Sequence, residues 1–339
     1  MEDPEKQHKP PPAVSWVRRI ALLASCLAWT CASSAAILAN KTILVKLHFP
    51  YPVTVSWLGL LTTSCLSYIA MQLFLPKESR RHVGPRYYAT RILPCGFFMA
   101  AAFLTGNVSF LFLTLAFVQM LKAFTPVVTM LLLFLVGLEA PKASLVASVV
   151  VISLGVAVAS YGELNLSITG LSSMLASVAA EAIRLVLMQT LLVDTSQSIH
   201  PLQGLFYISS ACTLWLMGQA LVWEWGPLVR AGALAQVAAN PYHFATAAVA
   251  GFSVNALAIA VIKLSSSLTL KVLGTVKDAA LVMVSVSLLH EQVTRLQLWG
   301  YSLSLCGFLS YNVVKALQHR SSSADNMLRS PSGQVVKLA

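Results

Sequence analysis

Ten long apolar segments follow one another along this chain and restrict its fold more than any other feature does. They lie at roughly 20–38, 52–75, 92–113, 115–136, 144–161, 169–193, 203–225, 241–262, 268–289 and 296–315. Each is close to the ~20 residues with which a helix crosses the hydrocarbon layer of a bilayer. Only 10% of the 339 residues are charged, whereas soluble domains carry about 25%. The sequence therefore predicts an all-α membrane protein with ten transmembrane helices, and it excludes a soluble domain or a nucleic-acid-binding protein.

The distribution of positive charge favours an even number of spans with both tails in the cytosol. If all ten segments cross the membrane, 15 of the 23 lysines and arginines lie on the cytosolic side, four on the opposite side and four inside spans. Such an excess is typical of cytosolic loops. The ninth segment is the weakest, because it contains Lys271, Lys277 and Asp278, but omitting it would blur the charge bias.

Ten spans divide the chain into two halves of five. We predict a cytosolic tail over residues 1–17, a first five-helix repeat over 18–161, a second over 162–316 and a disordered cytosolic tail over 317–339. Repeats with an odd number of spans insert in opposite orientations, and such inverted repeats are common in transporters. Substrate sites in these folds lie at the repeat interface near the middle of the membrane.

The fourth predicted span of each half carries one deep lysine. Lys122 is about seven residues into its span and Lys277 about ten, and a charge at the bilayer centre costs at least ~2.5–3.5 kcal/mol. Neither has an acid on the same face of its own helix, because Asp278 is the adjacent residue and points elsewhere. A buried ammonium without a partner needs an anion. An anion-binding site is therefore favoured over a structural pair between helices.

Three further charges inside the predicted spans each have two interpretations. Glu181 and Arg184 are three residues apart in the sixth span, on one helix face. They form either a structural ion pair or a substrate contact or gate. Lys271 lies about one turn inside the ninth span. It either extends its ammonium to the membrane surface or shares a polar cavity with Asp278.

The neighbours of Lys122 favour an open site. Gln119 lies one turn before Lys122, and Thr125 and Pro126 follow it. A proline at this place kinks or opens a helix. The fourth span is therefore predicted to be distorted next to its lysine.

Several short motifs point to one family of membrane proteins. They are Ala-Asn-Lys-Thr at 39–42, Ala-Phe-Val-Gln-Met-Leu-Lys-Ala at 116–123, Ser-Tyr-Gly-Glu at 160–163, Ala-Glu-Ala-Ile-Arg-Leu-Val-Leu at 180–187, Val-Leu-Gly-Thr-Val-Lys-Asp at 272–278, Gly-Tyr at 300–301 and Tyr-Asn at 311–312. Over about residues 20–317 the chain resembles the triose-phosphate translocator and nucleotide-sugar transporter branch of the drug/metabolite transporter superfamily. It is most similar to the plant-type subgroup marked by Lys-Asp in the ninth span. The resemblance implies ten helices, cytosolic tails and exchange by alternating access.

The resemblance also implies a substrate site. In the plastid phosphate translocators of this branch, a lysine at the Lys122 position and a Lys-Arg pair in the ninth span hold phosphate. This chain keeps Lys122 and Lys277 but has Asp278 in place of the arginine. A lysine of their sixth span falls near Gln189, and a tyrosine of their eighth falls next to Asn255. These departures argue against triose phosphate as the substrate.

The Phe-Tyr-Asn-Asn motif of Golgi GDP-mannose carriers survives only as Phe-Tyr-Ile-Ser around Tyr207, so that specificity is not expected. Taken together, the predicted substrate contacts are Lys122, Lys277, Arg184, Lys271, Gln119, Gln189, Tyr207 and Asn255, with Glu181 and Asp278 as structural or gating charges.

The predicted function is exchange of a phosphorylated organic anion, either a sugar phosphate or a nucleotide sugar, for phosphate or a nucleoside monophosphate. The expected partners are these anions and the lipid bilayer, with a homodimer left open, and no nucleic acid. The expected location is the Golgi or endoplasmic reticulum membrane. A plastid envelope is disfavoured because Glu2, Asp3 and Glu5 lie in the first residues, and transit peptides contain few acids.

No cofactor and no metal site are expected. The six cysteines lie in apolar segments without metal-ligand spacing, so we expect them to be small, buried and free of disulfides. An intramembrane lipid-modifying enzyme is the first alternative, but none of the seven histidines lies deep in a span. A non-transporting membrane scaffold is the second, and the short loops leave it little surface for partners.

Overall fold

The computed structural model describes residues 16–137, 142–163, 166–193, 200–265, 267–288 and 290–329. Within these ranges all regular structure is helical and no strand occurs. Eight helical segments are long and apolar enough to cross a membrane: Arg19–Lys46, Pro52–Phe74, Pro85–Phe112, Leu115–Leu135, Ala143–Tyr161, Ile168–Met188, Pro201–Arg230 and Pro241–Leu264. They coincide with the first eight apolar segments of the sequence. The last two segments are also helical, but their crossing of a membrane stays a prediction.

The described residues form longer helices and a few short ones between them. The longer ones are α1 (Trp16–Lys41), α2 (Pro52–Phe74), α4 (Leu93–Phe112), α5 (Leu115–Lys122), α6 (Thr125–Leu135), α7 (Ala143–Tyr161), α8 (Ile168–Val193), α9 (Pro201–Gln219), α12 (Pro241–Leu264), α13 (Ser267–Ser287) and α14 (Arg295–Arg329). The short helices are α3 (Pro85–Tyr87), α10 (Trp225–Arg230) and α11 (Ala233–Ala239). A proline in the first turn starts α2, α9 and α12, where its missing N–H leaves no helical hydrogen bond unmade.

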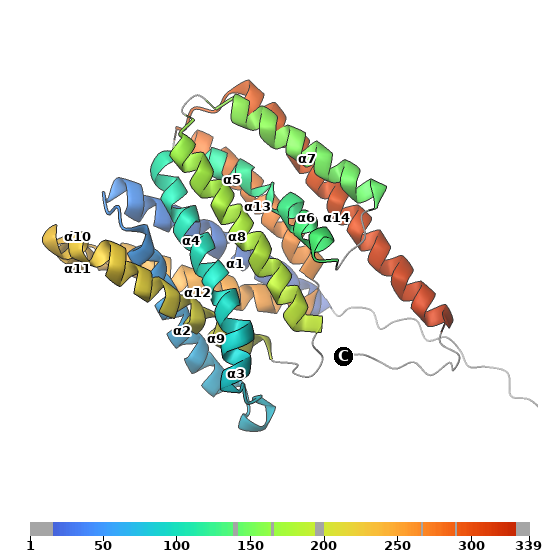
Figure 1. The fold of residues 1–339 in the computed structure, drawn as a ribbon, viewed down its shortest axis with the longest axis horizontal. Coiled ribbons are helices and arrows are strands. Elements are labelled where there is room, and N and C mark those ends of the chain that lie inside the picture. Colours follow the sequence, from blue (N-terminus) through green and yellow to red (C-terminus); the bar gives the residue numbers. More distant parts are fainter. Residues whose placement is uncertain are drawn as a thin grey trace, which may run out of the picture.

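Helices of the first half pack mainly against helices of the second half. The principal pairs are α7 with α14, α4 with α8, α1 with α12, α2 with α9, and α5 with α13. Figure 1 shows α7 and α14 side by side along one edge of the bundle, with α2 and α9 on the opposite side. The interior between these pairs is formed by α5, α13, α8 and α4.

The pair α7 and α14 approaches closely because glycines line the contact. A Cβ atom on Gly155 would lie 2.5 Å from the backbone nitrogen of Ser304, and one on Gly300 would lie 2.4 Å from that of Ala159. Ser304 Oγ also donates a hydrogen bond to the Ile152 carbonyl at 3.0 Å. Small residues let membrane helices pack backbone to backbone in this way. The contact holds α14 in place as one wall of the site described below.

The fourth apolar segment is broken into two helices, as its Thr-Pro step predicted. Helix α5 ends at Lys122, Ala123 and Phe124 form a turn, and α6 begins at Thr125. Pro126 lies in the first turn of α6 and cannot continue the hydrogen bonds of α5. The break leaves Lys122 in the last turn of α5, where the partial negative charge of the helix C-terminus stabilises a cation.

The prediction of a disordered tail from residue 317 is wrong for residues 317–329. Helix α14 continues to Arg329, and residues 330–339 lie outside the described part of the chain. No glycine or proline interrupts residues 308–329. Extending an existing helix needs no new nucleus, so a polar continuation of a long apolar helix stays helical. At the other terminus, α1 begins at Trp16, two residues before the predicted start of the first repeat.

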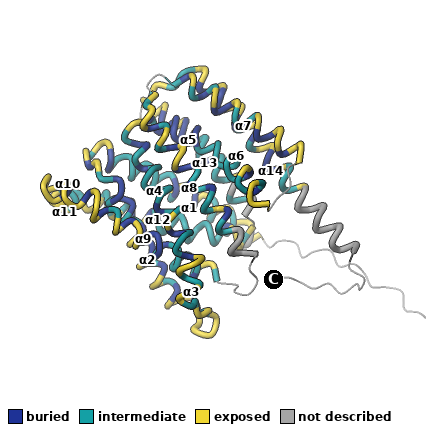
Figure 2. The backbone as a smooth tube through the Cα atoms, viewed as in Figure 1, coloured by how far each residue is buried: buried dark blue, intermediate teal, exposed yellow. Residues whose placement is uncertain are grey.

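The expectation that all six cysteines are buried is also wrong. Cys95 and Cys212 are buried, whereas Cys31, Cys65 and Cys306 are exposed, and all six are free thiols. Figure 2 shows that exposed residues run along the outer faces of the helices, while α5 is mostly buried. Lipid is as apolar as a protein interior, so an apolar segment does not reveal which face of a membrane helix points inward.

Candidate functional site

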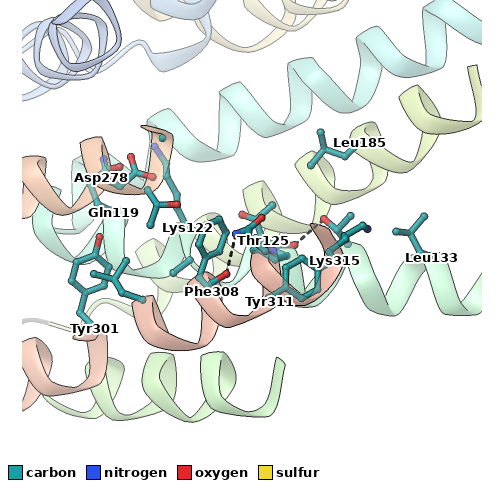
Figure 3. Close-up of a pocket in the computed structure, with 17 residues that line it drawn as sticks. Gln119, Lys122, Thr125, Leu133, Leu185, Asp278, Tyr301, Phe308, Tyr311 and Lys315 are labelled. Atoms are coloured by element: carbon teal, nitrogen blue, oxygen red, sulfur yellow. Dashed lines mark hydrogen bonds between the residues drawn. The ribbon is translucent and has the colours of Figure 1, made fainter. Parts of the chain in front are cut away.

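Two cavities meet at Lys122. The first has a volume of about 350 Å³ and lies among α5, α6, α13 and α14. Figure 3 shows Gln119, Asp278 and Tyr301 at one end of this cavity and Leu133 and Lys315 at the other. We call it the α14 cavity. Its inner end is polar, and its outer end lies where α6 and α14 leave the bundle.

The second cavity, the α8 cavity, has a volume of about 440 Å³ and lies among α1, α4, α5 and α8. Asn40, Asn107 and Glu181 line it. It shares Lys122 and Asp278 with the α14 cavity. These two residues, of opposite charge and from opposite halves of the chain, therefore stand between the two cavities.

Lys122 carries the charge that the structure leaves without a direct partner. Among the described residues, no hydrogen bond and no ion pair reaches its ammonium. Its nearest aromatic neighbour is Phe110, whose ring centroid lies 6.0 Å from Nζ, at the outer limit of a cation–π contact. A half-buried ammonium between two cavities, with only weak neighbours, has the chemistry that suits an anion.

The expectation that Lys277 is unpaired is wrong. Its Nζ lies 2.6 Å from Asp278 Oδ1, and the residue is only 6% exposed. Adjacent residues of a helix point in different directions, but the long flexible stem of lysine lets the ammonium reach back to its neighbour. Asp278 lines both cavities, whereas Lys277 does not line either of them. The pair is thus locally neutral and presents its acid to the site.

Glu181 and Arg184 form an ion pair, which is one of the two interpretations that their spacing allowed. Arg184 Nε lies 2.7 Å from Glu181 Oε2, and Arg184 Nη2 lies 2.5 Å from Oε1. This two-bond geometry is the strong arrangement for a guanidinium and a carboxylate. Glu181 lines the α8 cavity, and its carboxylate is already occupied by the arginine. The pair's role as a structural element or as a substrate contact stays open.

The other predicted contacts fall in different places. Gln119 lines the α14 cavity, as expected. Asn255 lines a third cavity of about 210 Å³, which shares Asn40 and Asn107 with the α8 cavity, and its Nδ2 donates to the Gly251 carbonyl.

Of the remaining three predicted contacts, only Tyr207 has a described side chain, and it lies away from Lys122. Tyr207 packs against Tyr88, with ring centroids 6.1 Å apart, and it lines none of these three cavities. Lys271 belongs to α13 and Gln189 to α8, but their side chains lie outside the described part of the structure.

The sequence analysis did not predict Glu291 as a site residue, and it noted Tyr301 only as part of the Gly-Tyr motif at 300–301. Tyr301 lines the α14 cavity from α14. Glu291 accepts hydrogen bonds from the backbone nitrogens of Leu115 at 2.9 Å and Ala116 at 3.0 Å, and it forms an ion pair with Lys41. Helix α5 has no acid in its own first turn, so a distant carboxylate occupies the positive end of the helix that carries Lys122. That missing acid is the only sequence signal that pointed to Glu291.

Further side-chain contacts join the helices at the end of the bundle where Glu291 lies. Glu224 accepts hydrogen bonds from the backbone nitrogens of Val53 at 2.9 Å and Thr54 at 2.8 Å, at the start of α2. Gln297 Nε2 donates to Glu163 Oε2. We call this end the Glu291 end and the opposite one the Lys315 end. The Glu291 end is thus held by charged and polar contacts between segments that are distant in the sequence.

Comparisons with known proteins agree with this architecture. The family model described as the Triose-phosphate Transporter family matches residues 20–312. A probable sugar phosphate/phosphate translocator of Arabidopsis thaliana is 30% identical over 305 residues, which cover 87% of this chain and 79% of that relative. A second protein of the same description and organism is 31% identical over 297 residues, covering 85% of this chain and 86% of the relative.

Two further matches have a lower sequence identity. UDP-URONIC ACID TRANSPORTER 1 of Arabidopsis thaliana is 26% identical over 292 residues, covering 85% of this chain and 94% of that protein. A solved crystal structure covers 88% of this chain and 97% of its own, with a TM-score of 0.50 at 13% identity, so it supports the fold alone. The named relatives are transporters and not enzymes, as the sequence predicted for this chain.

Proposed function

The chain belongs to the Triose-phosphate Transporter family, and we propose that it is an antiporter for a phosphorylated organic anion. The cargo is a sugar phosphate or a nucleotide sugar, exchanged for phosphate or a nucleoside monophosphate across an endomembrane. Two lines support the class of cargo: relatives named as sugar phosphate/phosphate translocators and as a UDP-uronic acid transporter, and the chemistry of the site. A single observation carries the proposal, namely the Lys122 ammonium between two cavities.

Lys122 suits a phosphate because its three N–H donors have no competing acceptor among the described residues. Asp278 lines the same two cavities as Lys122, and its Oδ1 atom pairs with Lys277 Nζ at 2.6 Å. Glu181 pairs with Arg184. Each acid is therefore neutralised by its own cation, and Lys122 remains as the positive charge in excess at the inner end of the α14 cavity, while Lys315 lines the other end. One excess positive charge beside about 350 Å³ of space fits a small organic phosphate.

The helix pairing supports ten spans in two inverted repeats. If the spans are numbered in chain order, the pairs α2–α9, α5–α13 and α7–α14 join span 2 to 7, 4 to 9 and 5 to 10. The pairs α1–α12 and α4–α8 join 1 to 8 and 3 to 6. Exchanging the two halves maps each of the first three pairs onto itself and the last two onto each other. A two-fold axis between five-helix repeats produces this pattern.

The same arrangement supports alternating access. The Glu291 end is tied by Lys41–Glu291 and by the contacts of Glu224 and Glu163, whereas the α14 cavity extends toward the Lys315 end. The excess of Lys and Arg assigns the Lys315 end to the cytosol. We therefore propose that the structure is the cytosol-facing state of the exchanger.

The remaining assignments follow from the same reasoning. Lys277 acts on substrate through Asp278, and Gln119 contacts the cargo directly. Asn255 lines the third cavity, and Arg184 acts on the α8 cavity through its ion pair with Glu181. Tyr207 contacts the cargo only if the transport cycle brings it to the site, and Lys271 and Gln189 stay proposed contacts. The proposed location is the Golgi or endoplasmic reticulum membrane. A homodimer stays open.

Exchange by purified protein in preloaded liposomes tests the proposal. Wild-type protein is expected to exchange at least one of glucose 6-phosphate, UDP-glucose, UMP or inorganic phosphate, and that anion is expected to raise its unfolding temperature. Lys122→Ala is expected to abolish exchange and the thermal shift while remaining folded. Lys142→Ala is the matched control, because Lys142 is exposed just before α7 and lines none of these cavities. Folded wild-type protein that exchanges no member of the panel would refute the proposal.

A further inference from the structure

Two buried polar side chains at the inner end of the α14 cavity have no hydrogen-bond partner in the part of the chain that the structure describes. Both the Oε1 and the Nε2 atoms of Gln119 lack one, as does the hydroxyl of Tyr301. Gln119 is 1% exposed and Tyr301 is 5% exposed, so bulk water does not satisfy them. Both residues line the cavity, one from α5 and the other from α14.

Unpartnered polar atoms at such depth require an explanation, because each costs free energy in the empty protein. A ligand that enters the cavity removes this cost when it supplies the missing partners. The amide of Gln119 donates and accepts hydrogen bonds, and so does the phenolic hydroxyl of Tyr301. Neither group carries a charge. Their natural complement is a group that also donates and accepts, namely an alcohol hydroxyl.

Asp278 adds a third group to the same wall. Figure 3 shows it at the same end of the cavity as Gln119 and Tyr301, and all three residues line this cavity. A quarter of its side chain is exposed, and one oxygen pairs with Lys277. A carboxylate accepts hydrogen bonds from hydroxyls and repels a second negative group on the ligand. The wall therefore favours a ligand that is neutral and rich in hydroxyls on this side.

We propose that Gln119, Tyr301 and Asp278 form a hydroxyl-binding subsite for the uncharged sugar ring of a substrate whose phosphate lies on Lys122. The proposal rests on the proposed exchange of phosphorylated anions and adds which part of the cargo is recognised. The subsite makes the carrier prefer neutral sugars to inorganic phosphate. It also makes the carrier reject sugars that bear a carboxylate, because Asp278 faces them.

The test is competition for exchange in proteoliposomes with matched pairs of anions. Glucose 6-phosphate is compared with inorganic phosphate, and UDP-glucose with UMP, so that each pair differs in a hydroxyl-bearing sugar. The variants Gln119→Leu and Tyr301→Phe remove hydrogen-bonding groups while keeping similar shapes. Each is expected to lower the preference for the sugar-bearing member of a transported pair roughly threefold to tenfold, the effect of one lost hydrogen bond.

The control variant is Gln219→Leu. The Oε1 atom of Gln219 is also buried without a partner, but the residue is the last of α9 and lines none of the three cavities described above. Its substitution is expected to leave the preference unchanged. Asp278→Asn is expected to raise acceptance of 6-phosphogluconate relative to glucose 6-phosphate, because the repelling charge is gone.

The outcomes separate this proposal from the one on which it rests. Folded wild-type protein that exchanges neither pair refutes the exchange function itself. Wild-type exchange with a sugar preference that survives both Gln119→Leu and Tyr301→Phe refutes the subsite and leaves the function standing. A change in Gln219→Leu equal to that in Gln119→Leu also refutes the subsite. Thermal unfolding of each variant shows that it is folded, and either of the first two variants alone is sufficient for the test.

Discussion

Lys122 and Lys277 occupy corresponding positions in the sequence, each deep in the fourth apolar segment of its half, yet the structure surrounds them differently. Lys122 lies at the break between α5 and α6 and lines both cavities without a direct partner among the described residues. Lys277 lies inside the continuous helix α13 and pairs with Asp278 at 2.6 Å. The depth of a lysine in a span thus indicates the cost of its charge but not how the protein relieves that cost.

The difference assigns the two lysines different tasks. A free ammonium between cavities attracts an anion, whereas a paired ammonium fixes its carboxylate. Under the proposed function, the first half of the chain supplies the binding charge, and the second half supplies a neutral pair whose acid lines the cavities. A clamp of two equivalent lysines, which the sequence favoured, would instead leave Asp278 without a function.

The largest expected effect that separates the two lysines is on stability. Lys277→Ala leaves the partly buried Asp278 carboxylate without its cation, and breaking a buried pair costs up to about 3–5 kcal/mol. Lys122→Ala removes a charge that has no direct partner, so its free energy of unfolding is expected to stay level or rise. Thermal unfolding in detergent measures both. Equal losses in the two variants would show that the lysines have equivalent surroundings.

A double-mutant cycle sharpens the same comparison. The variant Lys277→Ala with Asp278→Ala removes both charges together, so it is expected to recover part of the loss, with a coupling free energy of about 1–3 kcal/mol. Combining Lys122→Ala with Asp278→Ala is the control, and its effects are expected to be closer to additive. Additive effects for Lys277 and Asp278 would mean that their contact does not stabilise the protein.

Much of the architecture follows from the sequence, because long apolar segments and the Thr-Pro step report on the backbone. The break after Lys122 and the Glu181–Arg184 pair were predictable from spacing alone. The contact of Lys277 with Asp278 was not, because it depends on how a flexible side chain folds back. Lys41 and Glu291 are separated by 250 residues, and only the helix packing brings them together. Tyr301 was missed as a cavity residue for the same reason.

A third prediction concerns how α5 holds Lys122. Glu291 accepts from the backbone nitrogens of Leu115 and Ala116, and loss of such a cap costs about 1–2 kcal/mol. Glu291→Gln is expected to lower stability by this amount and also to slow exchange several-fold, because α5 carries the binding lysine. The matched variant is Glu224→Gln, which removes a similar cap from α2. Glu224→Gln is expected to lower stability as well, but to slow exchange less than Glu291→Gln does for the same loss of stability. If Glu224→Gln slowed exchange more, the Glu291 cap would have no special link to the site.

The smallest expected effect extends the comparison to a lysine near the end of α12. Lys263 Nζ lies 3.3 Å from His200 Nε2, just before α9. Burial and the Lys263 charge lower the pKa of His200 from its usual 6.5, and His200 Nδ1 accepts from the Leu202 backbone nitrogen, which only an unprotonated Nδ1 can do. Above pH 6.5 the histidine is neutral in both the folded and unfolded chains, so it adds no pH dependence. As pH falls below 6.5, the unfolded chain binds the proton more readily, and stability decreases. Solvent screens this site, so the loss is expected to be under about 1 kcal/mol.

Thermal unfolding between pH 7.5 and 5 measures this loss of stability. Lys263→Gln is expected to make the decrease smaller, and His200→Gln is expected to remove the contribution of the histidine. An unchanged pH profile in both variants would show that the lysine does not act on the histidine.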